Sequence, residues 1–139
     1  MIERAIFERA ARSLVGCPVR HMGRDRVSGL DCVGVPYAAA VESGLDLPPT
    51  LTYGPDPTPE QATQGLSEFC DLVNDIEQAH IWQVCLAGNL RHVVVPVGKL
   101  EERTLCVHAW ARRSRVLQTS WRSAEAIGWR IRGIEWQRH

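Results

Sequence analysis

One cysteine in this chain has the surroundings that nucleophilic chemistry requires. Cys32 follows Gly29-Leu30-Asp31 and precedes Val33-Gly34, a pattern typical of a loop that leads into a helix. A thiol at a helix N-terminus lies at the positive end of the helix dipole, near backbone N–H groups that favour the thiolate and can stabilise an oxyanion. Cys32 is therefore the candidate nucleophile, and the alternative is a small buried side chain without chemistry.

A nucleophilic thiol needs a base that accepts its proton and later gives it to the leaving amine. His92 and His108 lie in apolar segments, residues 92–97 and 104–110, that flank one expected hairpin. Neighbouring antiparallel strands can place both imidazoles on one face of a sheet. His92 is then the candidate base, and His108 the residue that holds its ring in the reactive tautomer. A structural role for both histidines is the alternative that spacing alone leaves open.

Helices are expected in the first half of the chain. Hydrophobic periodicity predicts a helix over residues 2–15 and another over residues 30–44, with Asp31 as the N-cap of the second. The proline-rich residues 45–58 are expected to form an irregular loop. A capping box from Thr58 to Gln61 then begins a third helix. The apolar faces expected for the first and third helices are Ile2, Ile6, Ala10 and Leu14, and Leu66, Phe69, Val73 and Ile76.

From residue 79 the apolar pattern is that of β-strands. Strands are expected over residues 81–86, 92–97, 104–110, 115–119 and 129–134, with turns at Gly88-Asn89 and Gly98-Lys99 and a short helix over residues 121–127. Helices first and an antiparallel sheet afterwards predict one α+β domain over residues 1–139.

Composition narrows the partners that such a domain can bind. The 139 residues carry 16 Lys and Arg against 16 Asp and Glu, and this zero net charge argues against a nucleic acid or an anionic membrane as partner. The five cysteines are spread without a CxxC, so we expect reduced thiols rather than disulfides. Cys17 and His21 have a zinc-like spacing, but no second pair matches it and no metal is expected. The N-terminal residues lack the apolar run of a signal peptide or a membrane span.

The segments around these residues resemble the NlpC-type (NlpC and p60) family of cell-wall cysteine peptidases. Residues 15–21 and 29–34 are similar to the part of that family in which an Asp-Cys-Val-Gly or Asp-Cys-Ser-Gly signature opens a helix around the nucleophile. Arg91-His92, followed by small apolar residues, resembles the family's base strand, and Val107-His108-Ala109 resembles the next one. The chain departs from the family at Val19, where an aromatic residue is usual, and at Val33, where serine is commoner.

The resemblance implies a papain-like cysteine peptidase fold, with N-terminal helices packed on a C-terminal antiparallel sheet. It implies a triad of Cys32, His92 and His108 that needs no cofactor and hydrolyses an amide of the peptidoglycan stem peptide, between D-glutamate and a diamino acid. Asp31 would help to bind the substrate's free amine, although helix capping alone also accounts for an aspartate there.

The local motifs are most similar to those of small stand-alone peptidases of tailed phages and gene-transfer particles. A place in a virion tail is therefore expected, with tail-tip proteins as partners and the periplasmic cell wall as the place of action. A tail-tip or hub component that keeps the peptidase fold for assembly is one alternative. A thiol enzyme that acts on small peptides in the cytosol is another.

Overall fold

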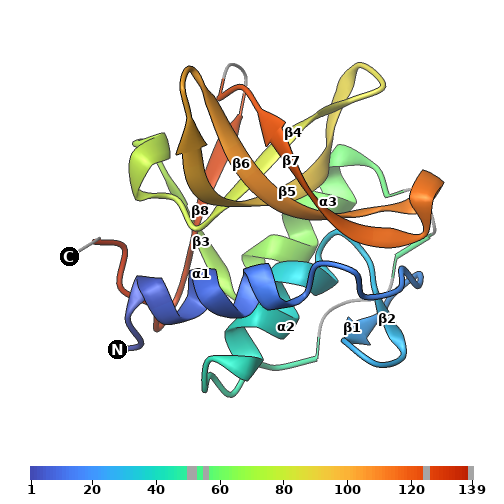
Figure 1. The fold of residues 1–139 in the computed structure, drawn as a ribbon, viewed down its shortest axis with the longest axis horizontal. Helices are drawn as coiled ribbons and strands as arrows, with labels where there is room; N and C mark the ends of the chain where they lie inside the picture. The colour runs from blue at the N-terminus through green and yellow to red at the C-terminus, as the bar shows by residue number, and fades with distance from the viewer. Residues whose placement is uncertain (50–52, 55–56, 124–125, 138–139) are drawn as a thin grey trace.

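The structure, a computed structural model, describes residues 1–49, 53–54, 57–123 and 126–137 and consists of helices packed on an antiparallel sheet (Figure 1). The predicted α+β architecture is confirmed. The helices are α1 (Arg4–Ser13), α2 (Gly34–Glu42) and α3 (Pro59–Ser67), with 3-10 turns η1 (Ile76–Gln78) and η2 (Ala111–Arg113). The strands are β1 (Arg24–Asp25), β2 (Gly29–Leu30), β3 (Cys70–Val73), β4 (Ile81–Leu86), β5 (Asn89–Leu100), β6 (Arg103–Trp110), β7 (Arg115–Trp121) and β8 (Ile127–Ile131).

The main sheet has six strands in the order β3-β8-β4-β5-β6-β7, and β1 and β2 form a separate pair. Figure 1 shows α1 and α2 below this curved sheet, with both termini at one end. Near these ends, Ile2 pairs with Ile134 in an isolated bridge. Within the described ranges, no helix is both long and apolar enough to cross a membrane.

The buried face of α1 differs from the predicted one. Phe7, Ala11 and Leu14 are fully buried, whereas Ile6 is 41% exposed. The difference arises because Arg4 is buried on the same face as Phe7, and its guanidinium donates to the carbonyl oxygens of Ala79 and Trp136 at 2.7 Å each. A buried arginine that donates to backbone carbonyl oxygens cannot be recognised from hydrophobic periodicity.

Helix α2 is buried on several sides and is built mainly from small residues. It approaches the loop before it so closely that a Cβ atom on Gly34 would lie 2.0 Å from the carbonyl oxygen of Gly23. The helix ends at Glu42, and Gly44 follows it with a φ of 114°. The predicted end of this helix at Gly44 is therefore confirmed. Glycine at position 34 therefore lets the loop carrying residues 22–24 pack directly on the start of the helix.

The third helix begins as predicted but ends early. The Thr58–Gln61 capping box is confirmed. Helix α3 ends at Ser67, however, and Cys70–Val73 forms β3, which pairs with β8. The predicted helical face through Val73 and Ile76 is therefore wrong, because pairing with a strand some sixty residues later in the chain overrides the local pattern. Before α3, the described residues of the 45–58 segment form no helix or strand, and residues 50–52 and 55–56 lie outside the described ranges.

The strands at residues 81–86, 92–97, 104–110 and 115–119 are confirmed, but their connections differ in detail. The first turn lies at Ala87 and Gly88, and Gly98 forms no turn. Strand β5 instead continues to Leu100, with a shift of register between Pro96 and Gly98. The expected helix over 121–127 is also wrong at both ends, because residue 121 ends β7 and residue 127 begins β8; residues 124–125 lie outside the described ranges.

Candidate active site

Cys32 lies in the turn between β2 and α2. Helix α2 begins at Gly34 with Val33 as its N-cap, so the prediction that Asp31 is the N-cap and Cys32 the first helical residue is wrong. The Asp31 side chain nevertheless accepts a hydrogen bond from the N–H of Gly34 at 2.8 Å. The backbone carbonyl oxygen of Asp31 accepts another from the N–H of Val35 at 3.1 Å. These bonds satisfy N–H groups of the first turn just as a cap does, and they fix the backbone on both sides of Cys32.

A cavity of about 630 Å³ opens beside the thiol, and both Cys32 and His92 line it. The start of α2 and strand β5 thus bring the candidate nucleophile and the candidate base to one space. Other residues of the wall include Val19, His21, Asp31, Tyr53 and Trp110. His108 is only 1% exposed and is not part of the wall; it lies behind His92 on the neighbouring strand β6.

A chain of hydrogen bonds runs from His92 into the sheet. The Nε2 atom of His92 lies 2.8 Å from Nδ1 of His108, and Nε2 of His108 lies 2.7 Å from Oγ1 of Thr119. The indole N–H of Trp121 donates to the same Thr119 oxygen at 2.9 Å. Thr119 Oγ1 has two lone pairs and can accept from both neighbours. His108 can then donate from Nε2 and accept at Nδ1 from Nε2–H of His92, which leaves Nδ1 of His92 unprotonated.

The two imidazole rings are fixed by aromatic side chains as well as by hydrogen bonds. The rings of His92 and His108 meet edge to face with centroids 5.0 Å apart. Trp110 and Trp121 each contact both of them, with centroid distances between 5.4 and 6.0 Å. Such packing restricts the ring rotamers and holds the His92 imidazole at a constant orientation to the cavity.

Burial sets the protonation states of these groups. It lowers the pKa of His92 to about 3, with smaller contributions from His108 and the charge of Arg91, and it lowers the pKa of His108 to about 4. Burial also raises the pKa of Cys32 to about 12, and the nearby charge of Asp31 adds to this effect. The backbone N–H of Val93, the residue after His92, favours the Cys32 thiolate but does not offset the loss of solvation.

The expectation that the helix N-terminus favours the thiolate is therefore not met. Helix α2 begins after Cys32 rather than at it, and desolvation opposes the charged form more strongly than the nearby N–H groups support it. The resting site combines a neutral thiol with neutral imidazoles. A nucleophilic role for Cys32 would therefore require that its proton be transferred during the attack.

The oxygens of Asp31 are occupied by donors from the protein itself. Oδ1 accepts from Arg24 at 2.7 Å and from Gly34, and Oδ2 accepts from the Tyr53 hydroxyl and from the N–H of Met22 at 3.1 Å. A carboxylate has about four lone-pair sites. An amine could bind Asp31 only by sharing or replacing one of these donors, so the structure favours a positioning role for Asp31 over direct recognition of a substrate amine.

Tyr53, Arg24 and Thr119 are site residues that sequence reasoning missed. Tyr53 comes from the proline-rich segment, is 7% exposed, and accepts a hydrogen bond from Arg24 at 2.9 Å. The alternation of side chains along the strand could have indicated Thr119. It lies two residues beyond Leu117, the partner of His108 in the β6–β7 pair, and therefore faces the same side of the sheet. No comparable signal connects Tyr53 with Arg24, because an irregular loop brings them together.

Replacing Asp31 by alanine is expected to lower the free energy of unfolding by about 3 kcal/mol, because the half-buried Arg24 guanidinium and several N–H and O–H donors would lose their acceptor. Urea unfolding measures this change. The matched control is Asp71→Ala, which removes an exposed pair with Arg132 and should cost less than about 1 kcal/mol. Equal losses in the two variants would show that Asp31 is not a central structural residue.

His21 lines the cavity and contacts the Tyr53 ring at a centroid distance of 5.9 Å. Among the described residues, no three His, Cys, Asp or Glu side chains come together as a metal site would require. Comparisons of the sequence with protein-family models and with curated proteins find no match.

Proposed function

We propose that the chain is a cysteine peptidase of papain-like fold that hydrolyses an amide of the peptidoglycan stem peptide. Cys32 is the nucleophile, His92 the base, and His108 the residue that orients His92. The observation that carries the proposal is the pairing of Cys32 and His92 in one cavity while His92 Nε2 lies 2.8 Å from His108. That contact occupies one ring nitrogen of His92 and leaves Nδ1 for Cys32.

The reaction follows from these roles. As a substrate carbonyl approaches, the Cys32 proton passes to Nδ1 of His92 while the sulfur forms a bond with the carbonyl carbon. The backbone N–H of Cys32 is the donor that we assign to the tetrahedral oxyanion, because the N–H groups of Gly34 and Val35 at the start of α2 already donate to Asp31. His92 then gives its proton to the departing amine, and the carbon–nitrogen bond breaks to leave a thioester. Water, deprotonated by His92, attacks the thioester, releases the carboxylic acid and restores the thiol.

The positive charge that forms on His92 in this sequence needs stabilisation inside the protein. Nδ1 of His108 can accept a hydrogen bond from Nε2–H of His92, and Thr119 with Trp121 favours the His108 tautomer that does so. This arrangement serves the purpose of the third member of a catalytic triad. It also explains why a histidine, which is neutral here, is sufficient in that position.

The substrate class and the location rest on the resemblance of the local motifs to NlpC-type cell-wall peptidases. The bond proposed is the one between D-glutamate and a diamino acid, and the place of action is the periplasmic wall, reached from a phage or phage-like tail. Three helices beside one antiparallel sheet, with the cysteine before a helix and the histidines on adjacent strands, support the papain-like assignment.

Digestion of purified sacculi tests the proposal. The unmodified protein is expected to release soluble peptides, identified by mass, and Cys32→Ala is expected to release none, because no other thiol lines the cavity among the described residues. Cys85→Ala, which alters an exposed thiol on β4 outside the cavity, is the matched control and should retain activity. Release by Cys32→Ala would contradict the mechanism. No release by any form would favour a tail component that uses the fold for assembly.

A further inference from the structure

The described wall of the cavity carries more basic than acidic side chains. Among the described residues of the wall, Asp31 is the acidic one, and Arg91 and Arg112 are the basic ones. The charge of Asp31 is balanced by Arg24, whose guanidinium lies 2.7 Å away. The wall therefore presents a net positive charge to a substrate, although the whole chain is neutral.

The two arginines come from two different parts of the sheet. Arg91 immediately precedes His92 on β5, and its Nε donates to the carbonyl oxygen of Leu86 at 3.2 Å, which anchors the guanidinium to the β4–β5 hairpin. Arg112 lies in η2, the connection between β6 and β7. A substrate in the cavity beside Cys32 and His92 thus shares that cavity with the side chains of Arg91 and Arg112.

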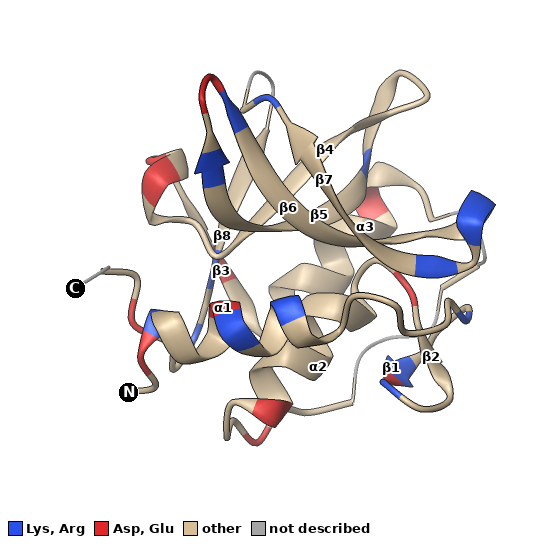
Figure 2. Ribbon diagram, in the orientation of Figure 1, with Lys and Arg blue, Asp and Glu red and all other residues tan. Residues whose placement is uncertain are grey.

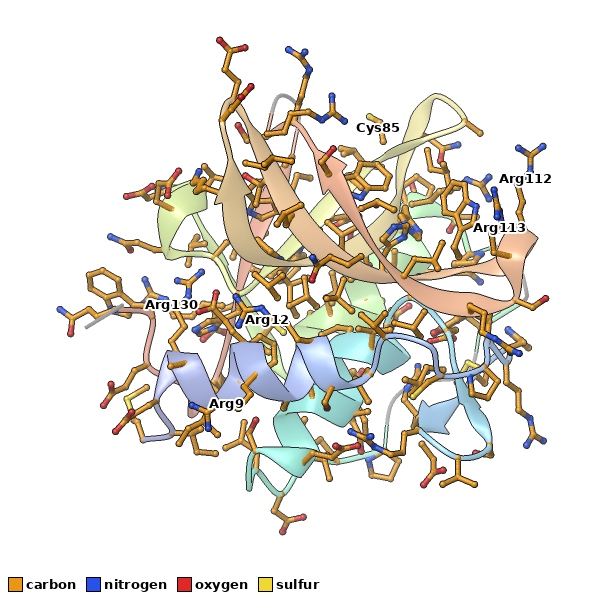
Figure 3. All side chains as sticks on the ribbon, in the orientation of Figure 1. Arg9, Arg12, Cys85, Arg112, Arg113 and Arg130 are labelled. Atoms are coloured by element: carbon orange, nitrogen blue, oxygen red, sulfur yellow. The ribbon has the colours of Figure 1, made fainter. Side chains whose placement is uncertain are left out.

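Arg112 is solvent-exposed and makes no hydrogen bond or ion pair with any residue that the structure describes. Figure 3 shows it extending with Arg113 from the β6–β7 connection. Figure 2 shows this basic connection at one end of the sheet, away from the acidic β5–β6 turn. Arg113 is equally exposed but does not line the cavity. Of these neighbours, Arg112 alone is placed to meet a group bound beside Cys32.

We propose that Arg112, together with Arg91, forms a subsite for a carboxylate of the substrate, so that the enzyme selects stem peptides whose carboxylates are free over those in which they are amidated. This inference rests on the proposed function. Glutamate has two carboxyl groups, and when one forms the scissile amide the other remains as an anion close to the reacting carbon. The planar guanidinium group matches a carboxylate in both charge and geometry.

The test uses two synthetic stem peptides that differ only in whether the second glutamate carboxyl group is free or amidated. For the unmodified protein, kcat/KM is expected to be about tenfold higher on the free acid, the size of a hydrogen bond to a charged group at a solvent-accessible site. Arg112→Gln should bring the ratio of the two kcat/KM values close to one. Arg113→Gln, the matched control for the loss of one positive charge, should leave the ratio near ten.

Each other outcome has a definite meaning. Equal cleavage of both peptides by the unmodified protein overturns the subsite and leaves the peptidase proposal intact. A preference that Arg112→Gln and Arg113→Gln reduce equally overturns the subsite too, since it indicates a diffuse positive field instead. Failure to cleave either peptide overturns the proposed function, and the subsite with it.

Discussion

Replacement of His92 by glutamine is expected to lower kcat by about three orders of magnitude, within the range usual for the loss of a general acid–base group. Glutamine keeps a polar side chain that can reach His108, but it cannot take the proton of Cys32. Because the thiol pKa is raised to about 12 by burial, only a minute fraction of Cys32 is ionised at neutral pH without help from a base. The variant therefore loses both the activation of the nucleophile and the protonation of the leaving amine. Hydrolysis of a defined stem peptide measures the change in kcat.

His21→Gln provides the matched control for this experiment. His21 lines the same cavity but is not part of the chain from His92 to Trp121. It should lower kcat by less than tenfold, with any larger effect on KM. Urea unfolding of both variants checks that each is folded at the assay temperature. A His92→Gln protein that keeps more than a tenth of the activity would show that another group accepts the proton.

The candidate triad was accessible from the sequence because its signals are local. A cysteine between a loop and a small-residue helix, and histidines on adjacent strands, are each defined by a few neighbouring residues. The structure brings Cys32 and His92 to one cavity and joins His92 to His108 as that reasoning required. The protonation states were not accessible in the same way, since they depend on how deeply the finished fold buries each group.

Long-range pairing accounts for most of what the sequence did not reveal. Residues 70–73 follow a helix with suitable apolar spacing, yet they pair with β8 near the other end of the chain. Tyr53 and Arg24 meet at Asp31 because an irregular segment returns to the start of α2, and no periodic pattern records such a contact. Arg4 likewise occupies a core position through carbonyl acceptors from the second half of the chain.

Acid is expected to destabilise the fold through the two histidines that the mechanism uses. The pKa is lowered from 6.5 to about 3 for His92 and to about 4 for His108. Below pH 6.5 the unfolded chain therefore binds protons that the native state does not, and stability falls as the pH falls. Each histidine contributes at most about 1.4 kcal/mol per pH unit in this window, so the pair contributes a loss of roughly 5 kcal/mol between pH 6 and pH 4. That is a large part of the 5–15 kcal/mol typical of a domain.

Urea unfolding at pH 7, 6, 5 and 4 measures this loss, with the double variant His92→Gln/His108→Gln as the reference. The carboxylates and the other histidines contribute equally to both proteins, so the difference between the two curves isolates the pair. The unmodified protein should lose stability more steeply, and the excess should end as the pH approaches the native pKa values. Parallel curves would mean that the two histidines have the same pKa values in the native and unfolded states, so that burial does not hold them neutral. The acid dependence of stability thus tests, without any substrate, whether the native fold holds both imidazoles neutral.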